Sequence, residues 1–149
     1  MKKILRTPIT KDMVKDLKAG DSVEITGTIY TARDAAHKRM LENFEKGIPL
    51  PIDLNNAAIY FAGPAPAKPG EPIGSVGPTT SYRMDAYSPM TMDLGLTCMI
   101  GKGARSREVI DSMKKNTAVY IGAVGGAGAL ISECVRSCKV VDYADLGSE

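Results

Sequence analysis

The residues with the clearest chemical potential lie in the segment 77–85, which reads GPTTSYRMD. Its Gly-Pro start indicates a turn. Two hydroxyls, Thr79 and Thr80, follow at once, and Arg83 comes four residues after Thr79. If a helix begins after the proline, Thr79 and Arg83 share one face beside the free N–H groups of the helix start. Such a group would bind a carboxylate or a phosphate. The alternative that stays open is a capped surface helix with a solvated arginine.

The cysteines and the single histidine are the other candidates for chemistry. The chain has three cysteines, Cys98, Cys134 and Cys138, and an odd number without a secretory signal argues against a disulfide framework. Three thiols are also too few for a closed zinc or iron–sulfur site, which usually takes four ligands. We therefore favour buried structural thiols and predict no metal site. His37 lies in a predicted helix, where a surface or packing role is favoured over a catalytic one.

A glycine-rich run at 122–128, GAVGGAG, superficially resembles a dinucleotide-binding loop. The G-x-G-x-x-G spacing is not met, because position 131 is Ile. An anion at a following helix start is one interpretation, and tight backbone packing is the favoured one.

Composition excludes several classes of protein. The chain has 149 residues, of which 44% are hydrophobic and 24% charged, as expected for one soluble globular domain. A net charge of +2, two Phe and no Trp argue against nucleic-acid binding. No apolar run approaches the roughly 20 residues of a membrane span, and the first residues show no signal-peptide pattern. We expect a cytoplasmic location and no membrane partner.

Hydrophobic periodicity predicts short strands alternating with helices, hence an α/β or α+β single domain. We predict strands at 22–30, 57–61, 73–76, 97–101, 118–122 and 139–143, and helices at 10–17, 34–46, 90–94, 107–115 and 130–138. The predicted N-caps are Thr31 for the second helix, Ser88 for the third and Ser106 for the fourth. Four prolines in residues 64–72 indicate a stiff surface loop rather than a linker between domains.

Six stretches together resemble one family. They are 31–39 (TARDAAHKR), 59–64 (IYFAGP), 77–81 (GPTTS), 83–85 (RMD), 100–103 (IGKG) and 123–126 (AVGG). In this order they resemble the beta subunit, or C-terminal domain, of the class I, iron–sulfur-dependent fumarate hydratases and the related L-tartrate dehydratases. The resemblance runs from about residue 20 to residue 146. It implies that residues 1–149 form a single swivelling β/β/α domain, with a mixed sheet flanked by helices.

The resemblance also implies an activity and a partner. The reaction would be the reversible hydration of fumarate to malate, so the substrate would be a small dicarboxylate. In that family a [4Fe–4S] cluster is held by cysteines of the alpha subunit or N-terminal domain. This chain would bind no cofactor itself and would work in a hetero-oligomer with an iron–sulfur alpha subunit.

Carried over residue by residue, the resemblance assigns roles to four side chains. Thr79 would lie near the substrate carbon that loses its proton. Arg83 would bind a substrate carboxylate bidentately, Lys102 would supply a second cation, and Thr80 would also contact the substrate. Cations directed at the charge that builds up during proton abstraction lower the barrier. Asp85 is interpreted as a helix or ion-pair residue, because the family's proton-accepting aspartate belongs to the other subunit.

Two departures from the family pattern bear on the function. Tyr82 stands where the family usually has Gly, and we expect it to narrow the pocket or to change which diacid fits. The chain also stops some tens of residues earlier than is usual in the family. The alternatives are an L-tartrate dehydratase beta subunit and a non-catalytic module that binds a small dianion or assists assembly. A glycine-loop nucleotide binder is a third interpretation, and the failed spacing disfavours it.

Overall fold

Two parallel sheets organise the chain. The computed structural model describes residues 2–123, 131, 134–139 and 141–146. A two-stranded sheet has the order β1-β2, and a four-stranded sheet has the order β3-β4-β5-β6. The strands are β1 (Lys2–Arg6), β2 (Ser22–Thr26), β3 (Tyr30–Thr31), β4 (Ala58–Tyr60), β5 (Cys98–Gly101) and β6 (Val119–Gly122). The predicted α/β class is confirmed, and every strand pairing among the described residues is parallel where a mixed sheet was expected.

Short helices connect these strands. They are α1 (Lys11–Val14), α2 (Asp34–Glu45), α3 (Ser88–Asp93) and α4 (Arg107–Asn116), with the 3₁₀ helices η1 (Ser81–Met84) and η2 (Ala144–Leu146). Among the described residues, none of the helices has the length and apolar character needed to cross a membrane.

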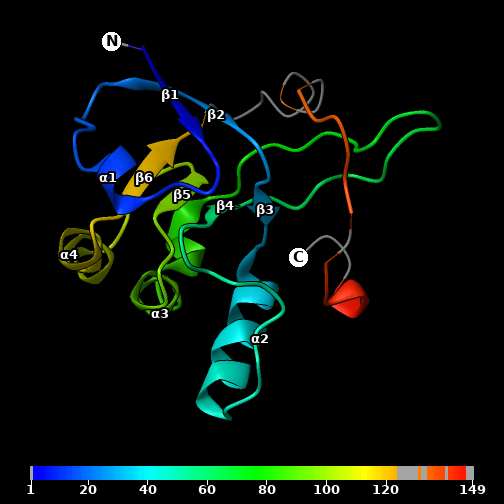
Figure 1. Ribbon diagram of the computed structural model, residues 1–149. Coiled ribbons are helices and arrows are strands. Elements are labelled where there is room, and N and C mark those ends of the chain that lie inside the picture. The colour runs from blue at the N-terminus through cyan, green and yellow to red at the C-terminus, as the bar shows by residue number, and fades with distance from the viewer. Residues whose placement is uncertain (1, 124–130, 132–133, 140, 147–149) are drawn as a thin grey trace.

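The four-stranded sheet is the middle of three layers. Figure 1 shows β1 and β2 above it and α2, α3 and α4 below it. Ala58 and Tyr60 of β4 pack into the core under β1 and β2, whereas Ile59 packs into the core against the helices. Burial on both faces explains the nearly unbroken apolar sequence of β4 and β5, which is typical of parallel strands. The arrangement agrees with the β/β/α layering that the sequence implied.

The predicted strand 22–30 divides between the two sheets. Gly27 has a φ of +115°, a conformation that favours glycine, and a side chain there would strike Thr7. The chain therefore leaves the first sheet after β2 and enters the second sheet at β3. Strand β1 was not predicted from the sequence; the first residues form it by pairing with β2.

Only one of the three predicted caps is confirmed. The side chain of Ser106 accepts the N–H of Val109 at 3.3 Å, at the start of α4. Thr31 lies in β3 instead, and Arg33 occupies the N-cap position of α2 without a side-chain cap bond. Ser88 is already the first residue of α3. Thr31 does not cap the helix because it belongs to β3, where it pairs with Tyr60 of β4.

Residues 64–72 form the predicted extended loop, which projects from the body of the chain in Figure 1. The two arms of the loop meet where Ala65 N–H donates to Ser75 O at 2.8 Å and Gly74 N–H donates to Ala65 O at 3.1 Å. The predicted strand at 73–76 is wrong, because this segment finds only that short pairing. The base of the loop is fixed by Tyr60, whose hydroxyl donates to Val76 O at 2.7 Å.

The C-terminal predictions fare less well. Residues 135–139 are not helical, so the helix predicted at 130–138 is wrong there, and the described part of 139–143 is not a strand. Within the glycine run, 124–128 lies outside the described residues. The described residues 141–146 contact α2 through Arg39. Arg39 forms a bidentate ion pair with Asp145, with both N–O distances at 2.7 Å, and its guanidinium lies 5.0 Å from the ring centre of Tyr143.

His37 is a packing residue in α2, as favoured from the sequence. It is fully buried, and its ring meets the edge of the Phe61 ring at 5.4 Å. Its Nδ1 lies 2.8 Å from Arg33 O, so this nitrogen carries the proton and Nε2 is unprotonated. Burial lowers the pKa of His37 from 6.5 to about 4, and the imidazole is therefore neutral near pH 7.

This burial predicts a loss of stability in acid. Between pH 6.5 and about 4 the unfolded chain protonates His37 while the folded chain does not, so the free energy of unfolding falls as the pH falls. At about 1.4 kcal/mol per pKa unit, this group contributes about 3 kcal/mol to the loss. Denaturant titrations from pH 7 to 4 measure it, with His37→Leu as the comparison. Equal pH dependence in both proteins would contradict the prediction.

Candidate functional site

The segment 79–81 crosses the carboxyl ends of β4 and β5. The N–H of Thr79 donates to Phe61 O at 2.7 Å, just beyond β4, and the N–H of Ser81 donates to Lys102 O at 2.9 Å, just beyond β5. Between these two bonds, Thr80 and Lys102 form an isolated parallel bridge. The backbone thus fixes Thr79 and Thr80 beside Lys102, although some twenty residues separate them in the chain.

This pairing corrects one sequence-based expectation. The helix begins only at Ser81, with Thr80 at its N-cap, so Thr79 and Arg83 do not share a helical face. The N–H groups of Thr79 and Ser81 are also not free for an anion, because the carbonyl groups at the sheet edge accept them. Two clefts in the described part of the chain, one beside Thr7 and Asn55 and one beside Pro89, are not lined by Thr79, Arg83 or Lys102.

The period of three residues in the 3₁₀ helix η1 decides which of its side chains are buried and which are exposed. Ser81 and Met84 share one face and are fully buried. Tyr82 and Arg83 are exposed, and Tyr82 has 62% of its surface accessible. Lys102 is exposed as well, and within the described residues neither Arg83 nor Lys102 forms an ion pair through its side chain. Two cations are therefore available to a ligand at this edge of the sheet.

Arg33 is a third cation at the same edge, and the sequence analysis assigned it no role. It follows β3 by two residues, and β3 runs parallel to β4, so their carboxyl ends meet at one edge. Its side chain is half-buried. The available signal was a basic residue two positions after a strand, and it was missed because β3 was not predicted as a separate element.

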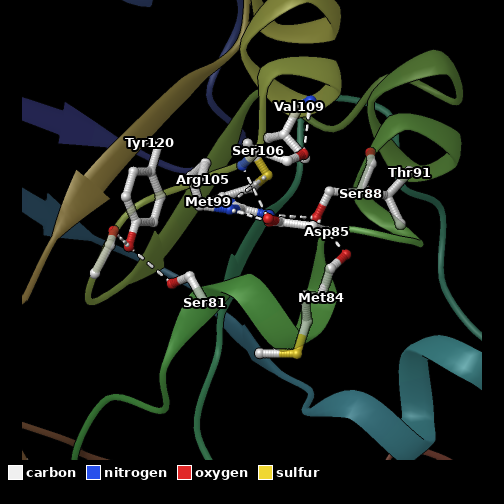
Figure 2. Close-up of polar contacts among 11 residues, drawn as sticks. Ser81, Met84, Asp85, Ser88, Thr91, Met99, Arg105, Ser106, Val109 and Tyr120 are labelled. Carbon is white, nitrogen blue, oxygen red and sulfur yellow. Dashed lines mark hydrogen bonds and ion pairs between the residues drawn. The ribbon is translucent and has the colours of Figure 1, made fainter.

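A buried ion pair joins the two segments of the site (Figure 2). The side chain of Arg105 is 2% exposed, and its Nε donates to Asp85 Oδ1 at 2.8 Å. The other oxygen of Asp85 accepts the N–H of Ser106 at 2.9 Å. Arg105 also donates to Ser88 Oγ at 2.6 Å. The interpretation of Asp85 as an ion-pair residue is confirmed, and both of its oxygens have partners.

Two aromatic rings contact the same guanidinium. Arg105 lies 5.1 Å from the ring centre of Phe61 and 5.0 Å from that of Tyr120. These distances lie within cation–π range. A desolvated cation so surrounded fixes β4, β6 and the loop after β5 relative to one another.

The described part of the chain does not fit an iron–sulfur cluster. No group of three or more Cys, His, Asp or Glu side chains there is placed to hold a metal ion. Burial raises the pKa of the Cys98 thiol to about 12, so it stays protonated near pH 7, whereas a cluster ligand must be a thiolate. Cys134 and Cys138 are exposed, which corrects the expectation that they are buried.

Comparison with known proteins decides the family. Residues 2–149 match the profile described as "Fumarase C-terminus". The chain belongs to the Fumarase C-terminus family. It is 38% identical over 129 residues to the aerobic class I fumarate hydratase of Escherichia coli K12, covering 85% of this chain and 24% of that protein. It is 40% identical over 129 residues to the mitochondrial fumarate hydratase 1 of Leishmania major, covering 85% and 24%.

A shorter relative matches over most of its own length. A protein of Methanocaldococcus jannaschii, named as the beta subunit of an L(+)-tartrate dehydratase, is 38% identical over 140 residues, covering 92% of this chain and 72% of that protein. The chain therefore spans about a quarter of the length of the fumarate hydratases that it resembles, and most of the length of this subunit.

We predict that Arg105→Met strongly destabilises the fold, because it leaves the Asp85 carboxylate buried beside an apolar side chain. Breaking one partner of a buried pair costs about 3–5 kcal/mol. The matched control is Arg107→Met, which removes an arginine whose side chain is 78% exposed and which pairs with Asp111 on the same helix. An exposed pair contributes about 0–1 kcal/mol. Chemical denaturation measures both, and equal losses would contradict the prediction.

Proposed function

We propose that this chain is the beta-type half of a two-component hydro-lyase that interconverts fumarate and malate. Its family and its relatives support this reaction class. The observation that carries the proposal is the bridge between Thr80 and Lys102, with Arg83 exposed three residues later. The bridge brings Thr79 and Thr80 beside Lys102 at one edge of the sheet, and Arg83 follows on the adjoining η1.

The chemistry of a dicarboxylate suits this set of groups. Fumarate and malate are dianions, and a guanidinium binds a carboxylate through two parallel hydrogen bonds. Arg83 and Lys102 would bind the substrate carboxylates, with Thr80 beside them. Removal of the proton next to a carboxylate builds further negative charge, which the same cations stabilise.

Thr79 would transfer the proton, and it needs help to do so. An alcohol is a weak base unless a neighbouring group accepts its proton. Asp85 is the acidic residue nearest in sequence, and Arg105 and Ser106 already engage both of its oxygens. The accepting carboxylate would therefore come from the alpha-type partner, which closes over the exposed edge.

We place the [4Fe–4S] cluster in that partner as well, since the described cysteines of this chain do not suit it. When bound there, the cluster supplies a Lewis acid for the substrate hydroxyl. This chain would bind the carboxylates, orient the substrate and move the proton at the carbon that reacts.

A tartrate dehydratase is the second candidate, and the relative from Methanocaldococcus jannaschii favours it. The two substrates differ in their hydroxyl groups, while their carboxylates are the same. The phenol of Tyr82, which is exposed and next to Arg83 in the chain, is one described group that would contact such a hydroxyl. Anaerobic assays of the assembled complex with malate and with L-tartrate separate the two reactions. Binding of a dianion without turnover would instead favour a non-catalytic module.

In the assembled complex, Arg83→Ala and Lys102→Ala are each expected to lower kcat/KM by about 100-fold or more, because each removes a cation from the developing charge. Arg107→Ala is the control, since it removes another exposed arginine, which lies on α4. Unchanged turnover in the Arg83→Ala complex would overturn the assignment of this residue.

Thr79→Val is expected to lower kcat by about 100-fold or more while KM changes little, because the hydroxyl acts in the proton transfer and not in carboxylate binding. Thr79→Ser keeps the hydroxyl and should retain most of the activity. Steady-state kinetics of malate dehydration measure both variants, and a Thr79→Val complex as active as Thr79→Ser would refute the role.

A further inference from the structure

We infer that Tyr120 is a positioning residue that sets the spacing between the two segments of the proposed site. This inference rests on the proposed function. The hydroxyl of Tyr120, on β6, lies 2.8 Å from Ser81 Oγ and 2.9 Å from Gly103 O. Ser81 belongs to the segment that carries Thr79 and Arg83, and Gly103 follows Lys102 directly. One phenol oxygen therefore bridges both segments (Figure 2).

The protons of this bridge are assigned by counting donors. A carbonyl group can only accept, so the single phenol proton of Tyr120 is donated to Gly103 O. The contact between Tyr120 and Ser81 must then use the Ser81 hydroxyl as donor. The bridge runs in one direction, from Ser81 through Tyr120 to Gly103, and each hydroxyl proton in it is used.

The surroundings leave the bridge little freedom. Ser81 is fully buried, and a side chain at Gly101 would strike its Oγ. The guanidinium of Arg105 packs over the Tyr120 ring, 5.0 Å from the ring centre, and restrains the ring. Because the ring is held by packing, the hydroxyl can fix the loop at Gly103 relative to Ser81.

The consequence for the proposed reaction is geometric. Backbone pairing already joins Thr80 to Lys102, but the loop turns away at Gly103, where φ is +87°. The phenol bridge is a direct side-chain contact between Gly103 and η1, in addition to the bonds of Arg105 and Ser106 with Asp85. Loosening it would let Lys102 shift relative to Thr79 and Arg83, and a shift of about 1 Å near reacting groups costs about 100-fold in rate.

Tyr120→Phe tests the inference, because it removes only the hydroxyl and keeps the ring against Arg105. In the assembled complex we expect kcat to fall about tenfold or more, with KM changed by less than about threefold, because alignment matters most in the transition state. Ser81→Ala should lower kcat in the same way. The double variant should be no worse than Tyr120→Phe by itself, because both changes break one bridge.

The matched control is Tyr143→Phe. It also removes one phenol hydroxyl, which accepts a hydrogen bond from Asn43 at 3.3 Å on α2. It should leave kcat unchanged. Amide hydrogen exchange of the complex gives a readout without turnover: the Ser81 N–H should exchange about tenfold faster in Tyr120→Phe and at the normal rate in Tyr143→Phe.

The outcomes separate this inference from the proposed function. If Arg83→Ala abolishes turnover while Tyr120→Phe matches the wild type in kcat and in exchange, the bridge has no positioning role. If Tyr120→Phe and Tyr143→Phe lower kcat equally, the effect is general destabilisation and the inference also fails. If the complex has no hydro-lyase activity, the proposed function fails, and unchanged exchange at Ser81 in Tyr120→Phe would then overturn the bridge separately.

Discussion

A guanidinium with 2% of its side-chain surface exposed can persist in a fold only if its charge and its donors are satisfied. Arg105 meets this requirement with Asp85, with Ser88 and with the faces of two aromatic rings. Asp85 in turn caps the backbone at Ser106. This requirement holds the segment 77–88 against the loop 102–106, and the residues of the candidate site belong to these two segments. The ion pair is thus a constraint on geometry first and a source of stability second.

The layering of the fold decides where the site can be. Helices and the β1–β2 sheet cover the two faces of the four-stranded sheet, so the ends of its strands are the part left for a ligand. In parallel sheets, ligands bind at the carboxyl ends of the strands. In this chain that edge carries Arg33, Thr80 and Lys102, with Arg83 on the adjoining η1. The two cations Arg83 and Lys102 are exposed, and this exposure suits the half-site that we propose.

Much of the fold follows from local sequence signals. The apolar runs at β4, β5 and β6 and the helix-forming composition of α2 and α4 are predicted close to their observed bounds. The errors fall where tertiary contacts compete with local preference. Gly27 interrupts the strand that the alternating pattern predicts at 22–30, because the two halves of this segment belong to different sheets. By contrast, the helix predicted at 130–138 is absent at 135–138 for a local reason, because Val135, Ser137 and Cys138 are weak helix formers.

For the site, the sequence by itself determined the chemical groups: two hydroxyls, a guanidinium four residues later, an ammonium after a buried strand, and an aspartate suited to an ion pair. It also indicated the family, because the motifs and their order along the chain can be read without knowing any tertiary contact. Only the tertiary structure decided that Thr80 pairs with Lys102, that Arg105 is the partner of Asp85, and that Tyr120 bridges Ser81 and Gly103. These contacts join residues about 20 to 40 positions apart. No local periodicity encodes such pairs, because they form only when burial of both sheet faces brings the strand ends together.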